Sequence, residues 1–170
     1  MKKLEIERRF LVKKEDVGSL YGVLCKRKVR SIINQMYSYD EQKNIVRYRY
    51  EHIEGRNSKV QDLFYKTKKK FISDGVFEED EVLMDHVEWI KELDKFRPHK
   101  QIIKWRFKVP YKGFIFEIDF INKGTEMCII EIELDDINQH FEFLPLLKKY
   151  ELTEITGKQE YSNYSLAKTV

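Results

Sequence analysis

Cysteine, proline and glycine are scarce in this sequence of 170 residues, which has two cysteines, three prolines and seven glycines. Cys25 and Cys128 lack a short metal-type spacing and are too few for a disulfide framework, so we expect a reduced, cytoplasmic protein. No proline- or glycine-rich linker, internal repeat or low-complexity tract is found, apart from the KTKKK run at Lys66 to Lys70. Residues 1–170 are therefore expected to form a single domain.

Long apolar stretches are also missing. No segment approaches the roughly 18 apolar residues of a membrane span, and the opening MKKLEIERRF reaches charged residues at once. We therefore expect neither a signal peptide nor a membrane partner. The four histidines are scattered without a metal-ligand spacing, which argues against a histidine metal site.

Charge is what the sequence has in excess. Charged residues make up 36% of the chain, against roughly 25% in an average protein, yet 32 basic and 29 acidic residues leave a net charge of only +3. This balance argues against a surface that binds nucleic acid over its whole extent. The segregation of the two signs along the chain is therefore more informative than their total.

Period-two alternation of β-branched and aromatic residues with polar ones predicts eight strands. The predicted strands are Leu4 to Val12, Ile32 to Tyr39, Ile45 to His52, Asp62 to Phe71, Val76 to Leu83, Ile102 to Val109, Phe114 to Ile121 and Met127 to Leu134. Short loops at Ser73-Asp74-Gly75 and Tyr111-Lys112-Gly113 suit hairpins, so consecutive strands should be mostly antiparallel. Eight strands are enough to close a barrel.

Acidic residues that could cap helices precede three apolar segments. The expected caps are Asp16, Asp85 with Glu88 three positions later, and Asp135 or Asp136. The third helix would carry Phe141, Leu144 and Leu147 on its apolar positions, with Pro145 kinking or breaking it.

Five of the predicted strands place charges of one sign at every second residue. They carry Glu5 and Glu7 followed by Arg9, Arg47 and Arg49, Lys66 and Lys68, Lys104 and Arg106, and Glu131 and Glu133. Alternate residues of a strand share a face, so each strand has one charged and one mainly apolar face. For any single strand, a charged face turned to solvent is the simpler interpretation.

Across the whole chain, the recurring parity favours charged faces that point into a barrel. Acidic and basic pairs fall on different strands, whereas a solvent face usually mixes Lys, Glu, Ser and Thr. Inside a barrel such charges need compensation by ions or a ligand. A polyphosphate with a divalent metal would provide it, because Arg and Lys match phosphate oxygens and clustered carboxylates hold a hard cation.

The charged strands also carry a family resemblance. The opening Leu4-Glu5-Ile6-Glu7-Arg8-Arg9-Phe10 resembles the ExExK signature of the CYTH superfamily, the triphosphate tunnel metalloenzymes. Motifs in family order follow over nearly the whole chain: Val46 to Arg49, Tyr65 to Lys68, Glu79 with Glu81, Ile103 to Arg106, Glu117 to Asp119, Glu131 to Glu133 and Tyr161 to Ala167. The resemblance implies an α+β, mainly β fold: a closed eight-stranded antiparallel barrel around a triphosphate tunnel, with flanking helices.

Four positions depart from the family pattern. Arg9 stands where the signature has lysine, and Phe77 stands where the family often has arginine. Lys158 and Glu160 stand where the family commonly has Asp and Arg. Arginine at the first position keeps the positive charge and can bind phosphate through two hydrogen bonds, but it cannot donate a proton at ordinary pH.

The resemblance implies roles for individual residues. The Mg²⁺ or Mn²⁺ ligands would be Glu5, Glu7, Asp119, Glu131 and Glu133, with Glu79 and Glu81 as further candidates. The triphosphate would be bound by Arg9, Arg47, Arg49, Lys66, Lys68, Lys104 and Arg106. Tyr37 and Lys104 would handle the attacking water, although a tyrosine on a strand is more often a packing residue.

The function that the resemblance implies is metal-dependent hydrolysis of inorganic triphosphate or a nucleoside triphosphate. Phosphoryl transfer needs in-line geometry and neutralised charge more than a covalent nucleophile, and the chain offers residues for both. Two alternatives stay open: an adenylyl cyclase that makes cyclic AMP from ATP, and a non-catalytic module that binds polyphosphate or a nucleotide. No nucleic-acid partner is expected other than a 5′-triphosphorylated RNA, and the protein could be a monomer or a homodimer.

Overall fold

The computed structural model describes residues 2–26, 29–55, 60–122 and 124–170. The strands and helices along the chain are β1 Lys2–Val12, α1 Lys14–Leu24, β2 Arg30–Tyr39, β3 Ile45–Glu54, β4 Val60–Ser73, β5 Val76–Met84, α2 His86–Lys95, β6 Lys100–Tyr111, β7 Phe114–Ile121, β8 Cys128–Leu134, the 3₁₀ helix η2 Pro145–Leu147, β9 Leu152–Glu154, the 3₁₀ helix η3 Gln159–Tyr161, α3 Asn163–Leu166 and β10 Lys168–Thr169. In the described part of the chain, no helix has the length and apolar character needed to span a membrane.

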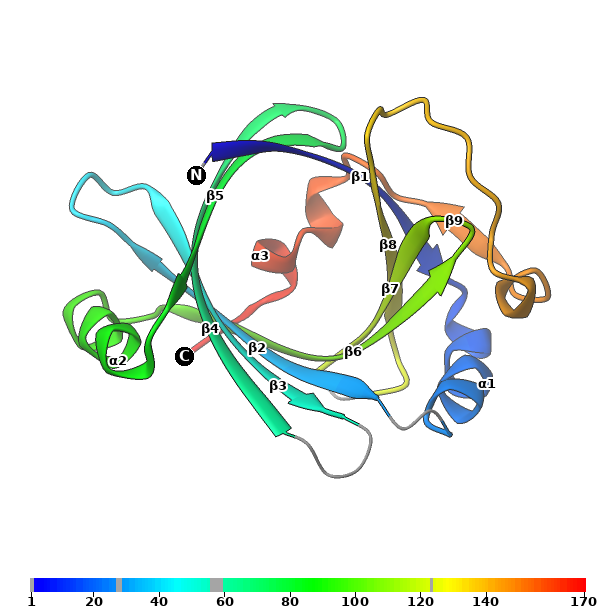
Figure 1. Ribbon diagram of the computed structural model, residues 1–170, viewed down its shortest axis with the longest axis horizontal. Coiled ribbons are helices and arrows are strands. Elements are labelled where there is room, and N and C mark those ends of the chain that lie inside the picture. The colour runs from blue at the N-terminus through cyan, green and yellow to red at the C-terminus, as the bar shows by residue number, and fades with distance from the viewer. Residues whose placement is uncertain (1, 27–28, 56–59, 123) are drawn as a thin grey trace.

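Strands β1 to β8 close into an antiparallel barrel (Figure 1). The spatial order is β6-β2-β3-β4-β5-β1-β8-β7, and β7 pairs back with β6, so each of these strands has a partner on both sides. Closure satisfies the backbone hydrogen-bonding groups that an open sheet leaves at its edges. The eight-stranded antiparallel barrel expected from the sequence is thus confirmed, and all eight predicted strands are found with ends shifted by a few residues.

Both expected hairpins are confirmed, and each depends on residues with positive φ. Lys112 and Gly113, with φ of 47° and 84°, connect β6 to β7 in a two-residue turn, which suits the twist of paired strands. Gly75, with φ of 75°, turns β4 into β5. A Cβ atom at Gly75 would lie 2.6 Å from the carbonyl oxygen of Glu7, so glycine lets this hairpin pack against β1.

The largest apolar core lies outside the barrel wall. Its buried side chains come from the outward faces of β1, β6, β7 and β8, and α1 and residues 141–150 cover them (Figure 1). Phe116, Ile118 and Phe120, on alternate positions of β7, are fully buried there. Full burial of such side chains stabilises a fold by about 1.5–3 kcal/mol each. The apolar faces thus pack outward, which leaves the barrel interior to the charged faces.

The helices agree only partly with expectation. Asp85 caps α2 as predicted, because its carboxylate accepts hydrogen bonds of 2.9 Å from the backbone N–H groups of Val87 and Glu88. Asp16 does not cap α1. It lies inside the first turn, and its carboxylate accepts a hydrogen bond of 3.1 Å from the backbone N–H of Glu151.

The helix expected after Asp135 is wrong. Residues 135–144 form bends, a turn and irregular chain, and only the short η2 follows them. The Asp136 side chain accepts a hydrogen bond of 2.8 Å from the Asn138 N–H, an interaction that competes with helix formation. Pro145 also disfavours the helical conformation in the residue before it. Phe141, Leu144 and Leu147 still reach the outer core, but from irregular chain and the short η2.

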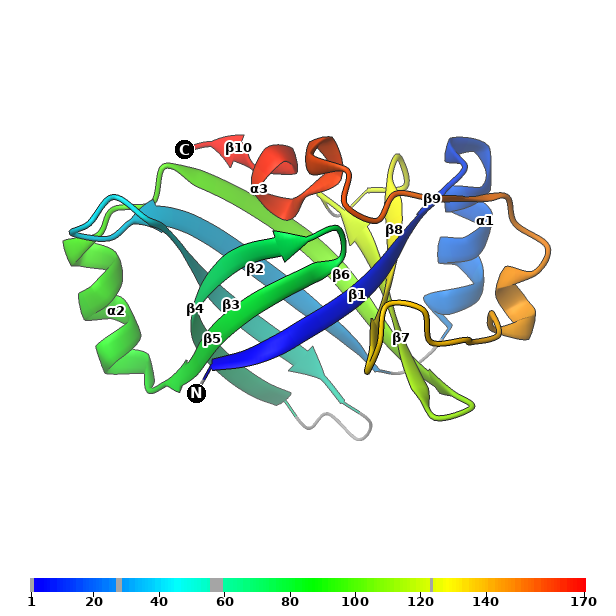
Figure 2. The same ribbon diagram turned by 90° about the horizontal axis from the view of Figure 1, so that it is seen from above.

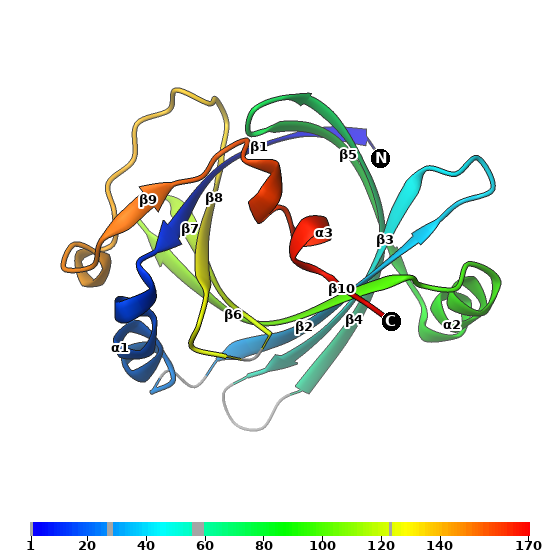
Figure 3. The ribbon, with the colours of Figure 1, turned by 180° about the vertical axis from the view of Figure 1, so that it is seen from behind.

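The C-terminal segment crosses one end of the barrel. Figures 2 and 3 show η3 and α3 over this opening, after which β10 joins β6. The Arg9 guanidinium donates a hydrogen bond of 3.1 Å to the Tyr161 carbonyl, and the rings of Tyr37 and Tyr164 pack edge to face with centroids 5.3 Å apart. Residues from inside the barrel therefore hold this segment in place.

Candidate functional site

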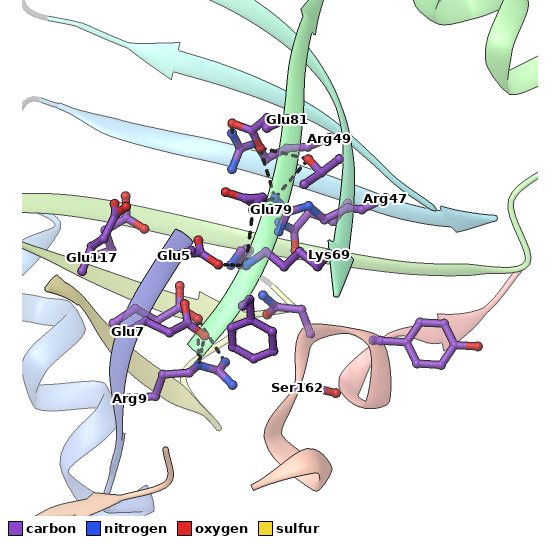
Figure 4. A pocket seen from close by; sticks show the side chains of 18 of the residues that line it. Glu5, Glu7, Arg9, Arg47, Arg49, Lys69, Glu79, Glu81, Glu117 and Ser162 are labelled. Carbon is purple, nitrogen blue, oxygen red and sulfur yellow. Dashed lines mark hydrogen bonds and ion pairs between the residues drawn. The ribbon is translucent and has the colours of Figure 1, made fainter. Parts of the chain in front are cut away.

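The barrel encloses a cavity of about 540 Å³, which lies within the size range of small-molecule sites. All eight barrel strands and the C-terminal segment contribute to its lining, and Figure 4 shows charged side chains from several strands converging on it. We call this cavity the tunnel.

Strand register explains why charged side chains point into the tunnel. Residues directly opposite each other in antiparallel strands share a face, and Glu7 lies opposite Glu133 just as Arg9 lies opposite Glu131. The predicted site residues that line the tunnel are Glu5, Glu7, Arg9, Tyr37, Arg47, Arg49, Glu79, Glu81, Lys104, Arg106, Glu131 and Glu133. Their roles there stay predictions.

Strand β4 turns the opposite parity inward from the one expected. Thr67 lies opposite both Arg47 and Glu81, so Thr67 and Lys69 line the tunnel. The ammonium of Lys69 pairs with the Glu5 carboxylate and lies 3.7 Å from Glu79 Oε1. Lys69 is therefore the tunnel cation of this strand.

The expectation that Lys66 and Lys68 face the tunnel is wrong. The Lys68 ammonium lies 2.7 Å from Asp40 Oδ2, and Lys66 pairs with Glu92 of α2 on the outer side. The run KTKKK has lysines at both parities, so the sequence could not decide which of them point inward.

Asp119 is the other predicted site residue that does not line the tunnel. It is 1% exposed, and its carboxylate accepts hydrogen bonds from Lys104 at 2.5 Å and from Arg106 at 2.6 Å. Burial opposes its ionisation, but the charges of Arg106 and Lys104 hold the pKa of Asp119 below its ordinary value. Glu117, two positions earlier on β7, lines the tunnel instead and pairs with Arg106.

Opposite charges within the tunnel are paired with one another. Arg47 donates hydrogen bonds of 3.2 Å to Glu79 and 3.1 Å to Glu81, and Arg49 donates one of 3.1 Å to Glu81. The buried Nε atoms of both arginines have no hydrogen-bond partner within the described ranges. Both guanidinium groups thus keep a donor that an additional acceptor could use.

Glu7 is the carboxylate for which a bound cation would matter most. Burial, and after it the negative charge of Glu131, raises the pKa of Glu7 to about 7. Its nearest ion-pair contact is Arg9, at 3.9 Å. Because few positive charges lie near this buried carboxylate, a bound cation would stabilise its ionised form.

The tunnel carboxylates are the kind of ligand that binds a divalent metal. Glu5, Glu7, Glu131 and Glu133 line the same cavity and offer the oxygen donors that Mg²⁺ and Mn²⁺ prefer. In the described part of the chain, no group of three or more acidic, His or Cys side chains already surrounds a single point. The carboxylates share the cavity but do not form a preassembled site.

The two predicted catalytic residues lie deep in the tunnel wall. Burial raises the pKa of Tyr37 to about 12, so its hydroxyl stays protonated at neutral pH and can donate a hydrogen bond. Lys104 is fully buried, and burial together with the charge of Arg106 lowers the pKa of its ammonium group.

Several residues that line the tunnel were given no site role from the sequence, although some of them lie in the family-like motifs. They are Lys69 and Phe71 on β4, Glu117 on β7, and Gln159, Ser162, Asn163 and Tyr164 in the C-terminal segment. The shared parity of Glu117 and Asp119 was a signal for Glu117. The C-terminal residues reach the tunnel only because that segment folds back over the barrel, which local sequence does not reveal.

Comparison with known proteins identifies the fold. No family model and no curated protein matches the sequence. Solved structures do match. The PH1819 protein from Pyrococcus horikoshii OT3 aligns with a TM-score of 0.56 and 17% identity over 78% of each chain. A putative adenylate cyclase (bh2851) from Bacillus halodurans aligns with a TM-score of 0.53 and 19% identity over 80% of this chain and 83% of that chain.

A chain in the Mediator head module of Schizosaccharomyces pombe also aligns, with a TM-score of 0.52 and 7% identity over 81% of this chain and 86% of that one. Identities this low show the fold alone. The protein therefore shares with these structures a closed eight-stranded antiparallel barrel, the fold that its CYTH-like sequence motifs implied.

Proposed function

We propose that this protein is a metal-dependent triphosphatase that hydrolyses inorganic triphosphate or a nucleoside triphosphate inside its tunnel. The observation that carries the proposal is the gathering of cationic and carboxylate side chains in one enclosed cavity within a CYTH-type barrel.

The cations of the tunnel suit a chain of phosphates. They are Arg9, Arg47, Arg49, Lys69, Lys104 and Arg106. Arginine binds phosphate oxygens through pairs of parallel hydrogen bonds, which fixes orientation as well as charge. Inside the barrel, these charges would stabilise the negative charge that the phosphoryl oxygens carry during transfer.

A divalent metal completes the proposal. Mg²⁺ or Mn²⁺ would be held by Glu5, Glu7, Glu131 and Glu133, and when bound it would neutralise charge on the phosphate oxygens. The chain itself would bind and orient the substrate. The C-terminal segment over one opening restricts access of bulk water, and the Tyr37 hydroxyl is a hydrogen-bond donor inside the same cavity.

Two other functions have some support from the comparisons. One of the similar structures is described as a putative adenylate cyclase, which favours cyclisation of ATP as the first alternative. The second alternative is a non-catalytic module that binds polyphosphate or a nucleotide; a chain of similar fold occurs in the Mediator head module.

The test is phosphate release from inorganic triphosphate, ATP and GTP, with Mg²⁺ or Mn²⁺, at neutral to alkaline pH. We expect turnover by the wild type and its loss in the double variant Glu5→Gln/Glu7→Gln. The matched control is Glu151→Gln, which removes an exposed carboxylate that pairs with Lys13. Absence of phosphate release despite tight triphosphate binding would support the binding module instead.

A further inference from the structure

Apolar side chains, two exposed and one half-buried, form a rim at one end of the mainly charged tunnel. Ile45 at the start of β3, Phe71 near the end of β4 and Phe77 at the start of β5 all line the cavity. Because these strands are antiparallel neighbours, the three positions lie at the same end of the barrel. Phe71 remains 51% exposed and Ile45 41% exposed.

The rim directly adjoins the cationic part of the tunnel. Phe71 and Phe77 lie opposite each other in the register, and their rings meet edge to face with centroids 6.0 Å apart. The Lys69 ammonium lies 5.3 Å from the centroid of the Phe77 ring. A ligand with its phosphates at Lys69 would therefore place whatever is attached to them against these two rings.

An apolar rim would not help the tunnel to bind inorganic triphosphate. Its oxygens gain nothing from apolar contact, and exposed apolar surface beside a polar cavity is typical of a binding site. A flat aromatic group gains contact on such rings, because stacking of a nucleic-acid base on an aromatic side chain contributes about 1–3 kcal/mol.

Two amide side chains elsewhere in the lining, Gln35 opposite Arg49 in the register and Asn163 in the C-terminal segment, offer further acceptors to an organic ligand. The buried side-chain oxygens of Gln35 and Asn163 have no hydrogen-bond partner within the described parts of the chain. An ionised phosphate cannot donate a hydrogen bond to them, whereas the N–H or O–H groups of an organic substituent can. Gln35 is 1% exposed, so an unpaired oxygen there has a cost that such a ligand would relieve.

We propose that the tunnel selects triphosphate esters that carry a flat aromatic group of the nucleobase type, which rests on Phe71 and Phe77 while the triphosphate extends past Lys69. This inference rests on the proposed function and names its substrate class. Phe71 and Phe77 determine specificity and do not take part in the phosphoryl chemistry.

The experiment is calorimetric binding of ATP and methyl triphosphate in EDTA, conditions chosen to suppress metal-dependent hydrolysis. Methyl triphosphate has the same ester linkage without the base. We expect ATP to bind the wild type about 5- to 150-fold more tightly, which corresponds to the stacking energy above. UTP and GTP in the same assay distinguish pyrimidine from purine preference.

Substitutions in the lining test which residues cause the preference for ATP. Phe71→Ala and Phe77→Ala should weaken ATP binding to near that of methyl triphosphate and leave methyl triphosphate binding unchanged. Ile115→Ala, which removes an exposed apolar side chain that lines the cavity from β7, is the matched control and should preserve the preference. Phe77→Tyr should also retain it, because the ring remains.

Equal affinity of the wild type for ATP and methyl triphosphate would overturn the inference and leave the proposed function standing. Equal weakening of both ligands by the phenylalanine variants would also overturn it. Failure of the wild type to bind or hydrolyse any triphosphate, with or without metal, would refute the proposed function, and the inference with it.

Discussion

Arg106 and Asp119 form an ion pair with two hydrogen bonds inside the barrel wall, with Nε to Oδ1 and Nη2 to Oδ2 both at 2.6 Å. They lie directly opposite each other on β6 and β7, and both are buried. The pair fixes the guanidinium so that its remaining donors reach Glu131 and Glu117 at the tunnel surface. Asp119 thus positions a tunnel cation.

Asp119→Asn should destabilise the protein by about 3–5 kcal/mol, because it removes the buried ion-pair partner of Lys104 and leaves Arg106 paired with Glu117 and Glu131 alone. Urea unfolding measures the change. Glu133→Gln is the control, since the Glu133 side chain is 64% exposed and its loss should change stability by less than about 1 kcal/mol. Unchanged stability of Asp119→Asn with lost metal binding would identify Asp119 as a metal ligand instead.

Lys69→Met should weaken triphosphate binding about 10- to 150-fold. The variant loses a hydrogen bond between charged partners, which contributes about 1.5–3 kcal/mol to the binding free energy. Lys68→Met should change affinity less than about twofold, because its ammonium pairs with Asp40 outside the tunnel. Calorimetry with inorganic triphosphate tests both variants. A larger effect at Lys68 than at Lys69 would show that β4 turns the other face inward.

The protonation of Glu7 should make stability depend on pH. Its pKa is about 7 in the folded protein, against an ordinary value of 4.5. Between these values the folded state holds a proton that the unfolded state has released, so the Glu7 contribution to stability falls as pH rises through this window. The full shift corresponds to about 3 kcal/mol.

The glutamine in Glu7→Gln does not titrate. The free energy of unfolding of this variant, relative to that of the wild type, should therefore rise by about 2–3 kcal/mol as the pH is raised from about 5 to about 8. Urea unfolding in EDTA at both pH values measures the difference. Added Mg²⁺ should reduce it, because the metal stabilises the ionised carboxylate of the wild type. If the free energies of unfolding of the variant and the wild type differ by the same amount at both pH values, Glu7 does not have the raised pKa.

Tyr37→Phe should lower the rate of phosphate release without moving the alkaline limb of the pH–rate profile. With a pKa of about 12, the hydroxyl donates a hydrogen bond over the whole working range and does not act as a base. Loss or displacement of the alkaline limb in the variant would show instead that this tyrosine titrates during turnover.

The barrel could be predicted because its evidence is local. Period-two alternation marked every strand of the barrel, though not the short β9 and β10, and Gly75 and Gly113 stand where the hairpins need positive φ. Most of the tunnel lining followed from the same parity. At β4 parity failed as a guide, because lysine occurs at 66, 68, 69 and 70 and only pairing with β3 and β5 decides which side is inward.

Other features depend on contacts between distant residues. Asp135 and Asp136 resemble helix caps, but the Asp135 carboxylate accepts a hydrogen bond from the Gln139 side chain and the Asp136 carboxylate accepts one from the Asn138 backbone N–H. Asp119 has the parity of a tunnel carboxylate, yet two buried cations surround it. No local pattern indicates that Asn163 and Tyr164 line a cavity formed by strands far away in the sequence.

The most direct test of the central claim is phosphorus NMR of ATP incubated with the protein and Mg²⁺. The account predicts ADP and inorganic phosphate, and their absence with Glu5→Gln/Glu7→Gln. Cyclic AMP with pyrophosphate, or unchanged ATP and unchanged inorganic triphosphate, would contradict it.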